Sequence, residues 1–224
     1  MVRETLTRKQ IVAAAIELLD AEGIDGLSMR KLGHRIGSAA TSMYWHVGSK
    51  ENLVVLAGDH VWNEVDLPDI EKLGWRDSTA TLARNTYAML TRHHWLAPAV
   101  STHFVYGPGM ARYQDHNYAV YEAAGFRGSD LDHAFDAVFN FVLGAAVSKS
   151  YETAMRTRLD RDDDGEVALV DILSRAEQTA SAFPRLAARI ADHHDVEPAT
   201  AERDAFEYGL DTILSGLDVR RHVL

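Results

Sequence analysis

The segment from residue 38 to residue 47 combines small, hydroxyl-bearing and aromatic side chains with two apolar residues. Met43 and Val47 are four residues apart, so in a helix they share one side and leave the other side to polar groups. Small side chains let a helix approach base edges closely, while hydroxyl and imidazole groups reach phosphate oxygens. The segment therefore predicts a helix that reads nucleic acid. The alternative is a small helical array in which Tyr44 and Trp45 only cover neighbouring apolar surface.

Histidine and carboxylate side chains are the other source of chemistry, and their spacing does not suit a metal site. The chain has 11 His and 33 Asp or Glu residues. The histidine pairs at 93–94 and 193–194 are adjacent, and neighbours on a helix point about 100° apart, whereas a shared metal favours i and i+4. The acidic run at 160–165 lacks the alternating ligands of a calcium loop and favours a solvated loop. A helical metal-dependent enzyme is the least supported alternative, and we expect no metal and no cofactor.

Three helices are predicted to position the polar segment. Thr7 and Gln10 fit a capping box at the start of the first helix, and Ser28 fits the N-cap of the second. Gly37 ends the second helix in a tight turn, and Ser49 caps a longer helix after the third. This layout is that of a helix-turn-helix, which places its second helix in the major groove.

The charge distribution favours contact between the first part of the chain and a polyanion. The whole chain has 23 Lys or Arg and 33 Asp or Glu, a net charge of −10. The first 50 residues nevertheless carry seven basic and five acidic groups, a net charge of +2, so the other 174 residues carry −12. A slightly basic head on an acidic body would confine DNA contact to the head.

The composition argues against several classes of protein. No apolar stretch approaches the ~20 residues that a membrane span needs, and the N-terminus lacks the layout of a secretory signal. The chain has no Cys, which excludes disulfides and thiol catalysis. We therefore expect a cytoplasmic protein with no membrane partner.

Beyond residue 50 the pattern is helical, which predicts an all-α fold with a helix-turn-helix domain at residues 1–50 and a larger helical domain at residues 51–224. Two helices near the C-terminal end have wide apolar faces, and Gly209 and Gly216 in the last one suggest close packing. Either a monomer core or a subunit interface would explain them, and a two-fold dimer would hold two heads one DNA turn apart. The residues assigned to a dimer interface are Phe135, Phe139, Val142, Leu143, Phe206, Leu210, Ile213, Leu214 and Leu217.

Several of these stretches resemble a known family. Residues 11–53 contain LSMRKL at 27–32, YWHV at 44–47, and Lys50 followed by Leu53, in the order and spacing of the DNA-binding head of the Tet repressor family. Stretches that are similar to the ligand and dimer domain of that family lie at residues 125–126, 137–138, 141–144, 206–210 and 216–217. The resemblance covers nearly the whole chain, strongly at residues 7–56 and weakly between 60 and 124.

This resemblance implies a homodimeric transcription regulator, usually a repressor that leaves its palindromic operator DNA when a small-molecule effector enters each body. An activator of the same fold is the alternative. Arg30 matches a family position that reads a base edge, Ala40 and Thr41 match base-facing positions, and Trp45 matches one that packs the head internally. The positions that match phosphate contacts are Ser42, Tyr44, His46 and Lys50.

The resemblance is weaker at the effector site. Where tetracycline-binding members of the family have a histidine, an asparagine, a phenylalanine and a glutamate, this chain has Asp66, Leu82, Thr86 and Ser148. A magnesium-tetracycline effector is therefore not expected, and we predict a mainly apolar cavity with a few polar anchors. The candidate anchors are Asn85, His103, Tyr106, Tyr113, His116 and Asn140.

Overall fold

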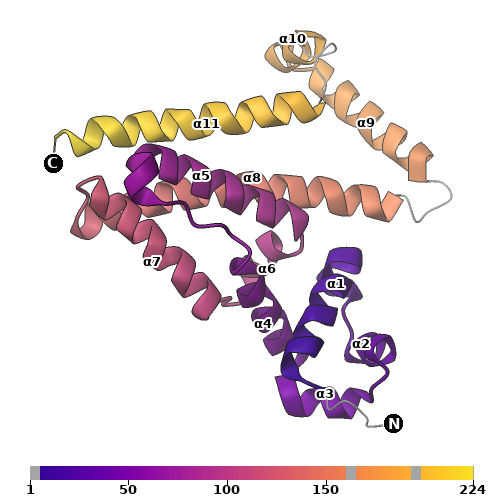
Figure 1. Ribbon diagram of the computed structural model, residues 1–224. Coiled ribbons are helices and arrows are strands. Elements are labelled where there is room, and N and C mark those ends of the chain that lie inside the picture. Colours follow the sequence, from indigo (N-terminus) through magenta and orange to yellow (C-terminus); the bar gives the residue numbers. More distant parts are fainter. Residues whose placement is uncertain (1–5, 160–164, 193–197, 224) are drawn as a thin grey trace.

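The computed structural model describes residues 6–159, 165–192 and 198–223, and every regular element in these ranges is a helix. The all-α fold class is therefore confirmed. In chain order the helices are α1 (Arg8–Gly26), α2 (Met29–Ile36), α3 (Ala40–Val47), α4 (Lys50–Trp62), α5 (Ile70–Arg92), α6 (Leu96–Thr102), α7 (Pro108–Ala123), α8 (Gly128–Leu159), α9 (Gly165–Ser181), α10 (Pro184–Asp192) and α11 (Pro198–Arg221) (Figure 1). The histidine pair at 193–194 and residues 160–164 of the acidic run lie outside the described residues.

The first three helices form a small head at one end of the molecule (Figure 1). The predicted capping box is present, because the Thr7 hydroxyl accepts a hydrogen bond from the Gln10 backbone and the Gln10 side chain accepts one from the Thr7 backbone. Ser28 caps α2 by accepting a hydrogen bond from the Lys31 backbone. Gly37 has φ 65°, the left-handed conformation that ends α2 and turns the chain toward α3.

The head is held together by an apolar core and by one close contact between α2 and α3. A Cβ atom added to Gly33 of α2 would lie 2.6 Å from the carbonyl oxygen of Ser38 and 3.1 Å from the Met43 side chain. Only glycine allows this approach without a shift of the turn. The buried core residues of the head include Ile11, Ala15, Leu19, Leu27, Leu32, Met43, Val47 and Leu53.

α4 connects the head to the rest of the chain. Ser49 caps it by accepting a hydrogen bond from the Asn52 backbone. The helix has 13 residues, so it spans about 20 Å at 1.5 Å per residue. Its first residue, Lys50, lies in the head, and its last residue, Trp62, is buried in the body. One continuous helix therefore connects the head to the interior of the body.

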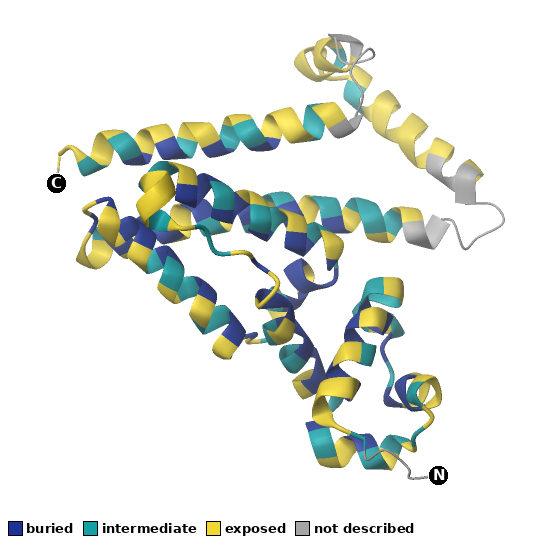
Figure 2. Ribbon diagram, viewed as in Figure 1, coloured by how far each residue is buried: buried dark blue, intermediate teal, exposed yellow. Residues whose placement is uncertain are grey.

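The body is a layered helical bundle. α5 and α7 pack on α8, and α11 runs along α5 and α8, whereas α9 and α10 lie at one end of α11 (Figure 1). Most described residues of α9 and α10 are exposed (Figure 2). None of the described helices is long and apolar enough to cross a membrane.

The apolar faces of α8 and α11, which carry the residues assigned to a dimer interface, pack mainly inside the chain, and their contact with a second copy stays a prediction. Phe135, Val142, Phe206, Leu210, Leu214 and Leu217 are buried, and Phe139, Leu143 and Ile213 pack half-buried against the same core. The reason is that α5, α7 and α11 of the same chain cover α8. Helical periodicity predicts an apolar stripe but does not say whether the same chain or a second copy covers it.

The opposite sides of α8 and α11 remain uncovered. Tyr151 and Tyr208 are 72% and 78% exposed, and a Cβ atom added to Gly144 or Gly216 would meet nothing within 4 Å. We call these two stripes the exposed face of α8 and α11. The exposed face consists of Asn140, Gly144, Val147, Ser148 and Tyr151 on α8, and Tyr208, Thr212, Gly216 and Val219 on α11.

Candidate DNA-binding surface and effector site

α3 presents a polar and aromatic surface to solvent. Met43 and Val47 are buried and fix the helix on the head core, as their spacing predicts. Thr41 and Tyr44 on the other side are exposed. The helix is only eight residues long and has no side-chain N-cap, so packing through its two buried residues is what holds its outer face in place.

The seven predicted DNA-contacting residues lie on α2, on α3 and at the start of α4. Lys50 is the first residue of α4, where free backbone N–H groups add to its attraction for a phosphate. The role of each residue at DNA stays a prediction. Arg30, Thr41 and Tyr44 are exposed, whereas Ala40, Ser42, His46 and Lys50 are half-buried.

Arg30 differs from the other basic residues of α2 in its pairing. Lys31 forms an ion pair of 2.5 Å with Glu22, and Arg35 forms one of 2.7 Å with Glu17, both on α1. Among the ion pairs and hydrogen bonds of the described residues, Arg30 has none, and its side chain is exposed. The structure thus leaves the guanidinium of Arg30 available to an external acceptor such as a guanine edge.

Trp45 does not pack inside the head, which corrects the reading taken from the resemblance. Its side chain is 91% exposed. α3 buries only the stripe of Met43 and Val47, and Trp45 lies outside that stripe. The large apolar ring is therefore presented on the same short helix as Thr41 and Tyr44.

The interior of the body contains an aromatic cluster that joins three helices. The Trp62 ring at the end of α4 lies 4.9 Å from the Tyr113 ring of α7 and 6.1 Å from the Phe139 ring of α8, measured between centroids. Thr86 of α5 donates a hydrogen bond of 3.2 Å to the Tyr113 hydroxyl. We call Trp62, Thr86, Tyr113 and Phe139 the interior cluster. Burial raises the pKa of Tyr113 to about 12, so its phenol is neutral at pH 7.

Several buried polar atoms of the body, one of them in the interior cluster, have no hydrogen-bond partner within the described part of the chain. They include the indole Nε1 of Trp62, the Oγ of Ser78 and the Nε2 of His116. A buried N–H group without an acceptor is costly, so these atoms are suited to meet a ligand. Sequence reasoning did not propose Trp62, and it placed Phe139 at the dimer interface. The sequence did point to this region through Thr86, from the resemblance, and through Tyr113, a candidate anchor.

The predicted effector residues divide into an interior and a surface group. Leu82, Thr86 and Tyr113 are buried, and His116 is half-buried with its Nε2 buried. Asn85 donates a hydrogen bond to the Asp66 carbonyl at the edge, and His103 ends α6, where it contacts the Thr102 hydroxyl. The remaining four side chains are exposed, so they do not line the interior of the single chain: Asp66, Tyr106, Asn140 and Ser148.

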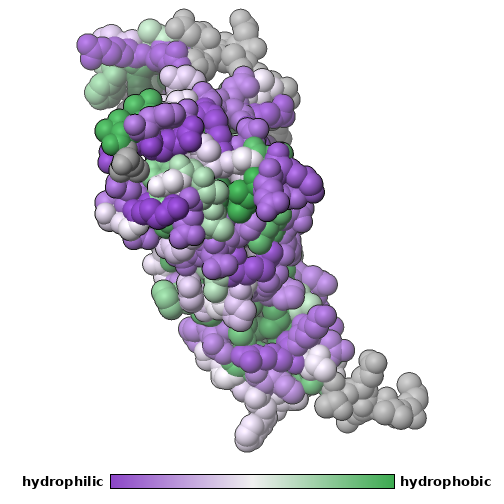
Figure 3. Space-filling model, turned by 60° about the vertical axis from the view of Figure 1, so that its left-hand side comes forward, coloured by the Kyte–Doolittle hydropathy of each residue, from purple (hydrophilic) through white to green (hydrophobic). Residues whose placement is uncertain are grey.

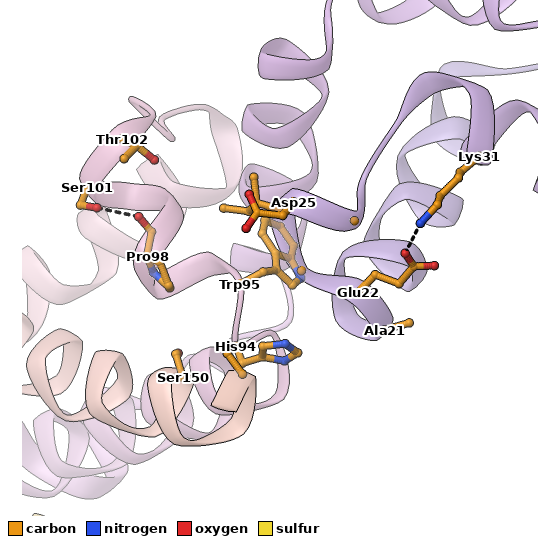
Figure 4. Close-up of a pocket in the computed structure, with 14 residues that line it drawn as sticks. Ala21, Glu22, Asp25, Lys31, His94, Trp95, Pro98, Ser101, Thr102 and Ser150 are labelled. Carbon is orange, nitrogen blue, oxygen red and sulfur yellow. Dashed lines mark hydrogen bonds and ion pairs between the residues drawn. The ribbon is translucent and has the colours of Figure 1, made fainter. Parts of the chain in front are cut away.

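A cavity lies where the head meets the body. This cavity of about 880 Å³ separates the last turns of α1 from α6 and α8. In Figure 4, Glu22 and Asp25 face it from α1, and His94, Trp95 and Ser150 face it from the body. The face of the molecule shown in Figure 3 is elongated and mostly hydrophilic, with apolar patches between the hydrophilic areas.

A helix-turn-helix head with an exposed third helix, joined by α4 to a helical body, defines the class of helix-turn-helix DNA-binding regulators. Residues 11–57 match the family model described as bacterial regulatory proteins, tetR family. Residues 67–221 match the model described as Tetracyclin repressor-like, C-terminal domain. The chain belongs to the TetR family of bacterial transcription regulators. It is a regulator and not an enzyme.

Two relatives and two solved structures of one protein support this assignment. An HTH-type transcriptional regulator of Saccharopolyspora erythraea is 41% identical over 145 residues, which make up 65% of this chain and 61% of that protein, less than two thirds of its length. The repressor DrrR1 of Streptomyces coeruleorubidus is 31% identical over 220 residues, 97% of this chain and 79% of that protein. Apo ActR from Streptomyces coelicolor is 25% identical, has a TM-score of 0.76 and covers 99% of both chains. ActR in complex with actinorhodin is 26% identical, has a TM-score of 0.74, and covers 97% of this chain and 99% of that chain.

Proposed function

We propose that two copies of this chain form a repressor that binds a palindromic operator through two heads and leaves it when a small molecule enters the interior cluster of each body. The observation that carries the DNA-binding step is the surface of the head. The polar side of α3 is exposed on a helix fixed by Met43 and Val47, and the neighbouring Arg30 has no ion pair within the described part of the chain. Tyr44 and Lys50 flank this surface and would hold phosphates.

The exposed face of α8 and α11 supports pairing of two copies. Two large side chains, Tyr151 and Tyr208, are exposed on it. Gly144 and Gly216 have open space above their Cα atoms, so a helix of a second copy has room to approach closely. Two helices from each copy would form a four-helix bundle, and its two-fold axis would set the distance between the heads. Asn140 and Ser148 would then contact the second copy, which accounts for their exposure in the single chain.

The interior cluster supports an aromatic effector with hydrogen-bond acceptors. Trp62, Tyr113 and Phe139 offer ring faces, and the Trp62 indole N–H has no acceptor. A relative of the same fold, ActR, has been solved with actinorhodin. A magnesium-tetracycline effector is not expected, because this chain has Asp66, Leu82, Thr86 and Ser148 where tetracycline-binding members have a histidine, an asparagine, a phenylalanine and a glutamate. The effector class therefore follows from ring stacking and not from metal chelation.

α4 supports a direct connection between effector and DNA. Trp62 ends the helix inside the interior cluster, and Lys50 begins it at the predicted phosphate contact. An effector that displaces the Trp62 ring would move α4 and change the spacing of the heads. Because coupling between two binding sites is reciprocal, effector and operator weaken each other's binding by the same factor.

A binding experiment tests this function. DNA flanking the gene is footprinted with the purified protein across a salt series, with Tyr44→Ala as the variant and Phe183→Ala, an exposed aromatic residue between α9 and α10, as the control. We expect a protected palindrome that is lost in Tyr44→Ala and retained by Phe183→Ala. If the flanking DNA is not protected, binding sites are selected from random DNA instead. Failure of the selection to enrich a palindrome, with effector removed by dialysis, would contradict the proposal.

A further inference from the structure

His93 lies at the junction of head and body, with both ring nitrogens on carboxylates. It is the C-cap residue of α5, and its side chain is 5% exposed. Its Nδ1 lies 2.7 Å from Oδ1 of Asp20 on α1, and its Nε2 lies 3.1 Å from Oε2 of Glu64, two residues after α4. The indole Nε1 of Trp95 donates a second hydrogen bond of 2.7 Å to the same Asp20 oxygen. We call these four residues the junction cluster.

This geometry requires a protonated ring. A neutral imidazole has one N–H donor, so its other nitrogen would point a lone pair at a carboxylate oxygen. Only the imidazolium donates to Asp20 and Glu64 at once. Burial lowers the pKa of His93, but the hydrogen bonds to the two carboxylates and their negative charges outweigh burial and raise the pKa above its ordinary value.

Two further titratable or charged side chains, Arg92 and His94, lie at the junction. Arg92 of α5 donates to the same Glu64 oxygen at 2.8 Å, so two cations meet the two carboxylates of the cluster. His94 lies next to His93 in the chain, and burial is the main cause that lowers its pKa. His94 is therefore the neutral neighbour. Loss of the His93 proton leaves only Arg92 to balance the two carboxylates of Asp20 and Glu64.

The junction cluster joins the head to the body. Asp20 belongs to the head, whereas His93, Glu64 and Trp95 belong to the body. The cavity beside the cluster keeps the end of α1 apart from α6 and α8 (Figure 4). The orientation of the head at this point thus depends on packing of α1 against α4 and on the hydrogen bonds of Asp20.

We propose that the His93 imidazolium is a positioning residue that holds the DNA-binding head on the body, so that operator affinity falls when the ring loses its proton. The inference rests on the proposed function. A head with a fixed orientation loses less freedom on binding two half-sites than a loose one, so the bridged form has the higher affinity. Because the pKa of His93 is raised in the folded protein, the bridge is present at low pH and is lost as pH rises through that pKa.

Operator affinity is measured from pH 6 to pH 9 at constant ionic strength for the wild type, for His93→Gln, and for His94→Gln as the matched control. Linkage limits the effect of one proton to tenfold per pH unit, and we expect the wild type to lose about three- to tenfold more affinity than His93→Gln over this range. The operator affinities of the wild type and His93→Gln should differ at pH 6 and become equal at pH 9. His94→Gln should follow the wild type, which shows that replacing any histidine at the junction does not cause the effect. His46, the histidine predicted to contact DNA, is present in all three proteins, so its contribution cancels in the comparison.

Asp20→Asn provides a second variant that keeps the acceptor for Trp95. Without the Asp20 charge the pKa of His93 falls, so we expect the decrease in affinity to begin at lower pH. Identical pH profiles for the wild type, His93→Gln and Asp20→Asn would overturn the inference.

A measurement without DNA separates this inference from the proposed function. Because the chain has no Cys, spin labels are placed on the exposed positions Lys9 and Glu122 by substitution with Cys, and labelled protein is diluted with excess unlabelled chain. We expect the head-to-body distance distribution to broaden as pH rises in the wild type and to be broad at all pH values in His93→Gln. A distribution that is independent of pH in both overturns the inference. If the bridge opens with pH but no operator is bound at any pH, the proposed function fails instead, and with it the claim about operator affinity.

Discussion

Phe141 on α8 packs so closely against Gly209 on α11 that a Cβ atom added to the glycine would lie 2.5 Å from the ring. Phe141 also packs against Phe206, one turn earlier on α11, with ring centroids 5.4 Å apart. Gly216, seven residues further along, has no atom within 4 Å of the corresponding position. The two glycines of α11 thus face different environments, one inside the chain and one open to solvent.

Gly209→Val and Gly216→Val should therefore have different effects. We expect Gly209→Val to destabilise the fold by about 1–3 kcal/mol, because overpacking against Phe141 exceeds the small gain in helix propensity. Gly216→Val should leave the unfolding of the single chain within about 0.5 kcal/mol and weaken association of two copies. Denaturant unfolding and sedimentation equilibrium measure the two effects. Unchanged association in Gly216→Val would remove this glycine from the proposed dimer face.

Arg30 and Lys31 form a matched pair on α2. Arg30→Ala should weaken operator binding by about 1–3 kcal/mol and relax the preference at one base pair, because an unpaired guanidinium is available to a guanine. Lys31→Ala should change affinity little, since Lys31 is paired with Glu22. Fluorescence anisotropy on the operator and on single-base variants measures both. Equal losses on all sequences for Arg30→Ala would show that this residue holds a phosphate.

Trp45 and Trp62 differ in their contribution to stability. Trp62 is 1% exposed, so Trp62→Ala should cost about 3–5 kcal/mol of folding free energy. Trp45 is 91% exposed, so Trp45→Ala should change it by less than about 0.5 kcal/mol. Urea unfolding of both variants is the measurement. A large loss of stability in Trp45→Ala would instead indicate that Trp45 packs inside the head, as the resemblance implied.

Tyr113 should contribute to the loss of stability at alkaline pH. Burial raises its pKa to about 12 in the folded protein, whereas an unfolded tyrosine ionises near pH ~10. The folded chain keeps the proton longer, so stability is lost as pH rises from about 10 to 12. Urea unfolding as a function of pH should show that the free energy of unfolding decreases less steeply in Tyr113→Phe than in the wild type. An equal slope in the variant would show that Tyr113 is already ionised or hydrated when folded.

The hydrogen bond between Thr86 and Tyr113 makes a prediction at pH 7. Tyr113→Phe leaves the buried Thr86 hydroxyl without its acceptor and should cost about 1–3 kcal/mol, and Thr86→Val should cost a similar amount. The double variant should cost less than the sum of the two, because no polar group is then left without a partner. Denaturant unfolding of the two single variants and the double variant measures these three costs. Additive costs would show that the two hydroxyls do not depend on each other.

Local signals in the sequence were sufficient to predict the head. The Thr7 capping box, the Ser28 and Ser49 caps, the turn at Gly37 and the spacing of Met43 and Val47 each depend on residues within one helical turn. Short-range hydrogen bonds and backbone preferences decide such features. They depend little on tertiary contacts, so the sequence alone predicts them. The helical body and its apolar stripes followed from periodicity in the same way.

Tertiary structure alone decided what covers each surface and which distant groups meet. Periodicity placed Val142 and Leu210 on apolar stripes, but packing of α11 on α8 within one chain determined that they are core. Nothing local to Trp45 distinguishes a packed indole from one that is 91% exposed. The bridge from Asp20 to His93 joins residues 73 positions apart. The sequence could not predict this bridge, because only the fold brings the two carboxylates that stabilise the imidazolium to its two nitrogens.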